Sequence, residues 1–346
     1  MTIAHGHIPV LVDPVLRVLS PQPGETALDC TAGRGGHAAA LAARLGREGT
    51  VIGVDLDAGN LAAAEARVNA LGAARFIPIH ASFDQAPQRL RELGLHADCV
   101  LADLGFASTQ IDDAARGLSF GSDGPLDMRY DCSKGRTAAE LLAVLSEREL
   151  AEMIRRLGEE PLAAKIARKI VHVRRSAPIQ TTLELAGLVT SVYGPRARRS
   201  RLHPATRTFM ALRIAVNDEL NALSRLLAEV RMVAEGKFEE GSDEGWLRVG
   251  ARVAIIAFHS LEDRLVKHAF IDLAKRGLAS RLTFKPVMAD DVELAMNPRA
   301  RPAKLRAIGV GAIGGIGAVA SPASGAGWST EWDDEDDAEE SEPQEL

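Results

Sequence analysis

This 346-residue chain has few cysteines, no long apolar run and no basic leader, and each absence excludes a class of protein. Its three cysteines form an odd, sparse set, which argues against a disulfide framework and favours a reducing compartment such as the cytoplasm. No apolar segment is long and uncharged enough to span a bilayer, so we expect no membrane partner. Residues 1–10 lack a basic segment followed by an apolar one, so we expect no secretory signal. Histidines and cysteines are not grouped at metal-ligand spacing, and we expect no metal.

Acidic residues are concentrated at the end of the chain. The net charge is −6, but residues 331–346 hold ten Asp or Glu and no Lys or Arg, so the remainder carries +4. A stretch rich in Gly, Ala and Ser begins at Ile308 and leads into this acidic end. Residues 308–346 therefore predict a disordered tail, which cannot bury enough apolar surface to order itself. Such a tail either solubilises the protein or competes with RNA for a basic cleft.

Basic residues dominate the segment 151–213, which has thirteen Lys or Arg against four Asp or Glu. Its densest part contains Arg196, Arg198, Arg199 and Arg201, followed by His203 and Arg207. Planar guanidinium groups suit phosphate recognition, and a basic field of this size makes binding salt-dependent. We expect this segment to bind nucleic acid. A solvated helical surface is the alternative, above all for the basic residues that precede this densest part of the segment.

The most informative motif runs from Thr26 to His37. An apolar strand expected over 26–28 ends at Asp29, a loop with Gly33, Gly35 and Gly36 follows, and a helix is expected over 38–45. A second strand over 50–54 finishes at Asp55, about twenty residues after the glycines. This is the spacing of a nucleoside-binding βαβ unit, in which the second acid binds ribose hydroxyls.

Charge favours S-adenosylmethionine as the nucleoside cofactor. The loop Gly33–His37 breaks the G-x-G-x-x-G spacing that a dinucleotide prefers, and no Gly-Lys-Ser/Thr follows for a P-loop. Asp29 would repel a pyrophosphate, whereas it would attract the sulfonium and ammonium of adenosylmethionine. A nicotinamide cofactor and a ligand-free strand-to-helix turn remain as alternatives.

Further strands are expected over 76–80, 97–103 and 252–258. Ligands lie at the carboxyl ends of the strands in open α/β sheets, so Asp29, Asp55 and Asp103 should converge on one crevice. Phe83 either stacks near the adenine or belongs to the core, and His259 either faces the crevice or is structural. Ser260 and Asp263 are expected to cap the helix that ends at Lys275. A long helix is expected over 210–234.

The chain resembles the bacterial 16S ribosomal RNA cytosine-N4 methyltransferases, from about His5 to Arg306. The strings that carry the resemblance are His7–Leu11, Gly33–His37, Asp103–Gly105, Gln110–Asp113, Gly124–Arg129, His203–Phe209, Phe258–Arg264 and Asn297–Arg301. The resemblance implies methylation of the cytidine at position 1402 of 16S rRNA, within the small subunit. It implies adenosylmethionine contacts at Gly35, Gly36, His37, Asp55, Phe83, Asp103 and Gln110, to which the loop adds Gly33. Two departures are Cys30, where the family usually has Gly, and Thr109, where it has Pro.

These observations predict a Rossmann-like class I methyltransferase sheet with an inserted helical domain. The expected boundaries are 1–112 and 210–307 for the methyltransferase domain, 113–209 for a basic RNA-recognition insert, and 308–346 for the tail. A homodimer is compatible with the sequence, which does not decide the oligomeric state.

Asp103 is the expected catalytic residue, because an acceptor for the N–H of cytosine N4 lets the nitrogen lone pair localise for methyl transfer. A backbone carbonyl of residues 104–106 is the alternative acceptor. Arg129 is expected near a phosphate, and His259 in the RNA-binding set. Cys132 as a covalent nucleophile is disfavoured because amine methylation needs no covalent intermediate. A nicotinamide-dependent oxidoreductase and a non-catalytic RNA-binding factor are the competing functions.

Overall fold

A seven-stranded sheet forms the centre of the computed structural model, which describes residues 9–105, 113–199, 202–237 and 245–311. Its strand order is β3-β2-β1-β4-β5-β7-β6. The strands are β1 (Thr26–Asp29), β2 (Thr50–Asp55), β3 (Arg75–His80), β4 (Ala97–Asp103), β5 (Leu247–Ala257), β6 (Ala279–Arg281) and β7 (Lys304–Val310). Strands β1 to β5 pair in parallel, and β7 pairs antiparallel with both β5 and β6. The Rossmann-like sheet expected from the sequence is therefore confirmed.

Helices cover both faces of this sheet, so its central strands are buried on both sides. One core cluster joins the sheet to α1 (Val12–Leu19), α2 (Gly36–Leu45) and α3 (Ala58–Leu71). The other joins it to α4 (Ala86–Glu92), α11 (Glu219–Ala234) and α12 (Ser260–Lys275). Cys30 and Cys99 lie in these two cores as small buried groups, as the sequence predicts. The short helix α13 (Asp291–Met296) precedes β7.

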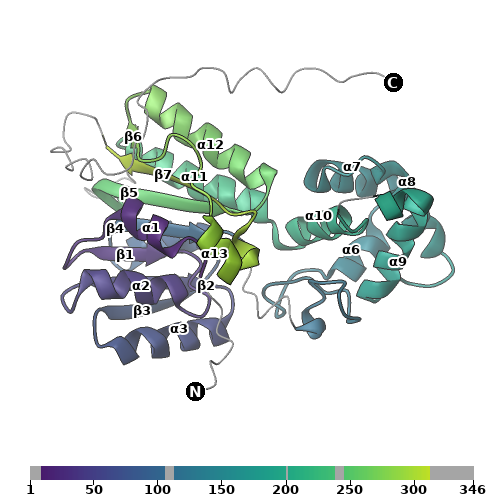
Figure 1. The fold of residues 1–346 in the computed structure, drawn as a ribbon, viewed down its shortest axis with the longest axis horizontal. Helices are drawn as coiled ribbons and strands as arrows, with labels where there is room; N and C mark the ends of the chain where they lie inside the picture. The colour runs from purple at the N-terminus through teal and green to yellow at the C-terminus, as the bar shows by residue number, and fades with distance from the viewer. Residues whose placement is uncertain (1–8, 106–112, 200–201, 238–244, 312–346) are drawn as a thin grey trace.

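A group of helices stands beside the sheet, at the right of Figure 1. Its members are α6 (Ala138–Val144), α7 (Glu147–Gly158), α8 (Ala163–Val173), α9 (Thr182–Tyr193) and α10 (Thr206–Asn217). They share a third core cluster, in which Leu126, Ile166 and Phe209 are buried. Ser and Thr side chains cap α6, α7 and α9 with capping boxes, which explains why these helices begin where they do. None of the helices in the described ranges combines the length and the apolar character that a bilayer-spanning segment needs.

Two expectations about helix and strand boundaries are wrong. The single helix expected over 210–234 is interrupted at Asp218, which has a left-handed backbone (φ 53°) and separates α10 from α11. Asp adopts this conformation more readily than most residues, because its short polar side chain bonds locally. The tail expected from Ile308 begins later, since Ile308 is fully buried and β7 continues to Val310. The end of this strand was assigned to the tail because a Gly-rich stretch follows it directly.

Candidate functional site

Strand register brings the three strand-end acids to one edge of the sheet. Asp29 on β1 pairs with Gly53 on β2 and with Leu101 on β4. Asp55 and Asp103 each lie two residues beyond those partners, at the carboxyl ends of their own strands. The expected convergence of Asp29, Asp55 and Asp103 therefore follows from parallel pairing. This edge is where open α/β sheets bind ligands.

Asp55 organises the loop after β1. Its Oδ2 accepts a hydrogen bond of 2.8 Å from the backbone N–H of Gly33, and its Oδ1 accepts one of 2.8 Å from that of Asp57. Burial raises the pKa of Asp55, and these two hydrogen bonds oppose the rise. Each carboxylate oxygen has a second lone pair, so the side chain keeps acceptor capacity for ligand hydroxyls.

The glycines of the loop make room for the protein itself. A Cβ on Gly35, whose φ is 79°, would lie 2.7 Å from Cα of Ala64 on α3. A Cβ on Gly36 would lie 2.9 Å from Cβ of Pro9. Gly33 also has a positive φ of 49°, but its Cβ position is open apart from the carbonyl of Thr31 at 3.9 Å. Of the three glycines, Gly33 leaves the most space for a ligand.

A buried cluster of ionisable groups lies behind this loop. His37 bonds through Nε2 to the carbonyl oxygen of Val10 at 2.8 Å, so Nε2 carries the proton. Its Nδ1 lies 3.5 Å from Oδ2 of Asp103. The backbone N–H of Asp103 donates to the Thr31 hydroxyl at 2.7 Å, which ties the end of β4 to the β1 loop. The sequence did not indicate this role for Thr31.

Burial controls the charge of these groups. It raises the pKa of Asp29 to about 6, against an opposing effect of His37. Burial, with a smaller contribution from the nearby Glu262 carboxylate, raises the pKa of Asp103 to about 8. Burial lowers the pKa of His37, so a neutral imidazole is favoured. Oδ2 of Asp29 and Oδ1 of Asp103 are both buried without a hydrogen-bond partner.

These unpartnered oxygens fit a positively charged nucleoside cofactor. A cation placed beside them would favour their ionised forms and offset the cost of burying a carboxylate. The phosphate groups of a dinucleotide would add negative charge to the same cluster. Asp29 is fully buried, so it would act on a ligand through its electric field rather than by direct contact. The residues present therefore suit S-adenosylmethionine better than a nicotinamide cofactor.

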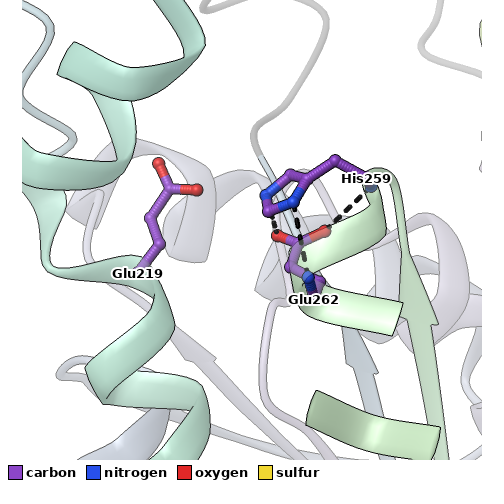
Figure 2. A group of neighbouring side chains, drawn as sticks. All are labelled: Glu219, His259 and Glu262. Atoms are coloured by element: carbon purple, nitrogen blue, oxygen red, sulfur yellow. Dashed lines mark hydrogen bonds and ion pairs between the residues drawn. The ribbon is translucent and has the colours of Figure 1, made fainter. Parts of the chain in front are cut away.

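His259, at the end of β5, begins α12 and faces two glutamates (Figure 2). Its Nδ1 accepts from the backbone N–H of Glu262, while Glu262 Oε2 accepts from those of Phe258 and His259. The cap expected from Ser260 and Asp263 is therefore wrong: His259 and Glu262 form the capping box one residue earlier. Asp263 instead pairs with Arg306. The sequence template favours Ser or Thr as a cap, which is why the histidine was missed.

Glu262 links this cap to the acid cluster, although the sequence analysis did not single it out. Burial would raise its pKa, but the hydrogen bond and charge of His259 and the charge of Arg213 hold it below its ordinary value. Nε2 of His259 is buried and lies 3.2 Å from Oε1 of Glu262, and through this contact the ring acts on the carboxylate.

Glu219, His259 and Glu262 bring their polar atoms within 4.8 Å of one another, a grouping that some metal sites share. Both oxygens of Glu219, however, already accept from Arg213, at 2.9 and 3.0 Å, and Oε1 also accepts from the Tyr130 hydroxyl at 2.9 Å. The guanidinium supplies the positive charge that a metal would provide. We therefore interpret the group as an ion-paired network, and the expectation of no metal stays a prediction.

This network joins the helical group to the sheet. Arg213 belongs to α10 and Glu219 to α11. The Asn217 side chain accepts from the backbone N–H of Tyr130 and donates to the carbonyl of Met128. A second link is Glu159, after α7, whose carboxylate accepts from the hydroxyl of Ser260 at 2.8 Å. The helical group is thus held beside the acid cluster.

Three of the expected RNA-binding residues form contacts within the protein. Arg129 forms a bidentate pair with Asp127, at 2.7 and 2.8 Å, which occupies most of its donors. His203 stacks on Phe120, with ring centroids 4.6 Å apart, and Arg207 donates to the carbonyl of Glu159. These interactions are internal to the protein, so a role in RNA binding stays a prediction.

The remaining expected residues are less constrained. Arg196 and Arg198 are exposed in the 3₁₀ segment Gly194–Arg199. The side chain of Arg199, together with Arg201 and Gln110, lies outside the described residues. Phe83 begins a short 3₁₀ turn and packs, half-buried, against the core cluster of α4. Its contact with an adenine is untested.

Comparisons with known proteins agree with this architecture. The MraW methylase family model matches residues 4–310. "Ribosomal RNA small subunit methyltransferase H" of Trichlorobacter lovleyi is 43% identical over 319 residues, covering 87% of this chain and 97% of that protein. The proteins of the same name from Pelobacter propionicus and Sorangium cellulosum are 44% and 45% identical, each over 87% of this chain, and are themselves covered over 97% and 90%.

Proposed function

The chain belongs to the MraW methylase family, which uses S-adenosylmethionine as methyl donor, and from that premise we propose that it methylates small-subunit ribosomal RNA. The proposed target is the exocyclic N4 of the cytidine at position 1402 in 16S rRNA, in the decoding region. The observation that carries the proposal is the pair of unpartnered buried carboxylate oxygens, on Asp29 and Asp103, beside a basic helical group. A ribosomal substrate would place the reaction in the cytoplasm. A homodimer stays a prediction.

The proposed division of labour follows the two parts of the structure. The sheet with its covering helices would bind the cofactor and perform the transfer. The helical group, which contains the exposed Arg196 and Arg198, would hold the RNA through its phosphates. Cytidine must leave its stack to reach the acid cluster, and a single-stranded loop makes that step inexpensive.

Cofactor binding would rest on residues at the carboxyl edge of the sheet. The Asp55 carboxylate would accept from ribose hydroxyls, and the open space at Gly33 would admit the nucleoside. S-Adenosylmethionine, when bound, supplies an electrophilic methyl group on a positively charged sulfur. Asp29 and Asp103 would stabilise that charge from their buried positions, since a positive neighbour favours ionised carboxyls.

The transfer itself would depend on orienting a weak nucleophile. The N4 lone pair of cytosine is delocalised into its ring, so the protein must hold the amine in line with the methyl group. In the proposed arrangement the Asp103 carboxylate accepts the N4–H and lets the lone pair localise. The backbone carbonyls after Asp103 are the competing acceptors. Water exclusion would come from the helical group held by Glu159 and Arg213.

The test uses labelled S-adenosylmethionine and small ribosomal subunits that lack the modification, with the methylated nucleotide mapped afterwards. Asp103→Asn should lower turnover at saturating cofactor by about a hundredfold or more. Asp98→Asn is the matched control, because Asp98 lies on the same strand at the opposite edge, where it accepts from the N–H of Thr26. Full turnover in Asp103→Asn would show that Asp103 only positions the cofactor. A label on another nucleotide would refute the proposed target.

A further inference from the structure

A basic hollow lies between α12 and strands β6 and β7, apart from the acid cluster. Its polar lining consists of Lys267, Arg281, Thr283 and Arg306, and Phe270 contributes to its apolar lining. Successive side chains of β7 point to opposite faces of the sheet, which explains why the hollow lies on the face covered by α12. Arg306 points to the same side as Ile308, which belongs to the core cluster under α12, whereas Leu305 and Ala307 belong to the cluster on the other face.

Positive charge in this hollow is not balanced by nearby acids. Asp263 is the acid at its border, and it already pairs with Arg306, at 2.6 and 3.1 Å, and with Lys304 at 3.4 Å. Within the described residues neither Lys267 nor Arg281 has a carboxylate partner. Burial and the nearby charge of Arg306 lower the pKa of Arg281, the result expected when two cations are held together. A bound anion would relieve that repulsion.

An exposed aromatic ring adjoins the cations. Phe284 is 63% exposed, and the guanidinium of Arg281 lies over its ring, 5.1 Å from the centroid. Arg281 also donates to the carbonyl of Phe284, which fixes the guanidinium beside the ring. A cationic groove next to an exposed aromatic is the combination with which proteins bind single-stranded nucleic acid, because phosphates pair with the cations and a base stacks on the ring.

Strand register relates the hollow to the acid cluster. Arg306 lies opposite Ile255, one residue before Ile256, which is the partner of Asp103. Strands β4 and β6 are separated by three strand spacings, about 14 Å. Lys304, opposite Ala257 at the carboxyl edge of β5, lies between the two places. Measured along the sheet, the hollow on the α12 side therefore lies about three strand spacings from the strand that carries Asp103.

We propose that Lys267 and Arg281, beside the Asp263-paired Arg306, bind the phosphodiester backbone of single-stranded RNA flanking the methylated nucleotide, and that a base of that strand stacks on Phe284. This subsite rests on the proposed function, which it extends with a second RNA-binding surface, separate from the arginines of the helical group. An acidic protein surface is the other class of partner that cations attract. The exposed ring beside the guanidinium favours RNA.

The experiment measures binding of short single-stranded RNA, containing the proposed target cytidine, to the full chain between about 50 and about 200 mM salt. The variants are Lys267→Ala with Arg281→Ala, and separately Phe284→Ala. The matched control is Arg44→Ala with Arg67→Ala, which removes two exposed charges from α2 and α3. Thermal unfolding and S-adenosylmethionine affinity, measured on every variant, identify any loss of fold.

The charge variant should weaken RNA binding about tenfold or more and lower the slope of log affinity against log salt by about one for each phosphate that is no longer neutralised. Phe284→Ala should weaken binding at least about fivefold with the slope unchanged. On small subunits, KM should rise while kcat stays within about twofold. Unchanged affinity and slope, or an equally large effect in the control, would overturn the subsite.

Three further outcomes separate this inference from the proposed function and from binding of a protein partner. If the unaltered chain methylates its target and the variants bind RNA normally, the subsite alone is wrong. If the variants bind RNA normally but lose affinity for intact small subunits, the hollow binds a ribosomal protein instead. If the unaltered chain modifies no cytidine, the proposed function fails whatever the variants bind.

Discussion

The charge state of Asp103 leads to a prediction about how cofactor affinity changes with pH. Burial and Glu262 raise the pKa of this carboxyl to about 8, so in the free protein at pH 7 it is only about one-tenth ionised. Besides Glu262 on α12, the groups that face it are His37 on α2 and Asp29 on β1. A cation binds the ionised form better. Affinity for a positively charged ligand should therefore rise with pH and should be accompanied by proton release.

The magnitude follows from the pKa. Between pH 7 and pH 9 the ionised fraction of Asp103 grows from about one-tenth to about nine-tenths, which corresponds to about tenfold in affinity, or about 1.4 kcal/mol. Asp29, with a pKa of about 6, is already mostly ionised in this range and contributes little. The window from pH 7 to pH 9 therefore isolates Asp103.

Isothermal titration calorimetry with two ligands tests this. S-Adenosylhomocysteine has the same amino acid group as S-adenosylmethionine but lacks the positive charge on sulfur. That charge makes the amine of S-adenosylmethionine the more acidic of the two, so Asp103→Asn is measured alongside to remove the titration of the ligand amines. Relative to Asp103→Asn, the preference for S-adenosylmethionine should grow about tenfold from pH 7 to pH 9, with nearly one proton released at pH 7. The same pH dependence in the unaltered protein and in the variant would refute this account.

Three other predictions concern stability. Gly35→Ala should cost about 2–5 kcal/mol in denaturant unfolding, because the new Cβ meets Ala64 and φ is positive, whereas Gly33→Ala should cost about 1–2 kcal/mol from its backbone alone; equal losses would contradict the packing argument. Glu219→Ala should cost about 3–5 kcal/mol, since it removes two hydrogen bonds and the nearest counter-charge from the partly buried Arg213 guanidinium, and an effect below about 1 kcal/mol would show that water replaces them. A chain ending at Gly311 should melt like the full chain, while one ending at Ala307 should melt several degrees lower, because it loses the buried Ile308 and Val310; equal melting temperatures would contradict the assignment of both residues to the core. If RNA affinity at low salt rises when the chain ends at Gly311, the tail competes with RNA, and unchanged affinity would exclude that role.

Local sequence patterns were sufficient for the five parallel strands and for the convergence of the acids, but they did not indicate the antiparallel β6 and β7. Apolar runs that end in Asp29, Asp55 and Asp103 define strands, and parallel pairing then brings their carboxyl ends to one edge. No long-range information beyond that rule is needed. Boundaries were less determined, because Ile308 is an apolar residue within a Gly-rich stretch, and only its place in β7 shows that it is buried.

Contacts between residues far apart in the chain could not be predicted from the sequence. The sequence places Gly35 and Gly36 in the cofactor loop, and only the structure shows that a side chain at either position would meet Ala64 or Pro9. It likewise does not show that Arg129 pairs with Asp127. The cap on α12 depends on a histidine that general cap preferences do not favour.

By itself, then, the sequence determined the five parallel strands, the cofactor class and the family, because each follows from local patterns and short motifs. Only the tertiary structure decided that Glu262 lies near enough to Asp103 to help raise its pKa, and that, among the described residues, Lys267 and Arg281 lack acidic partners. Charge state depends on burial and on which groups packing brings within a few ångströms. Neither is encoded in the spacing of residues along the chain.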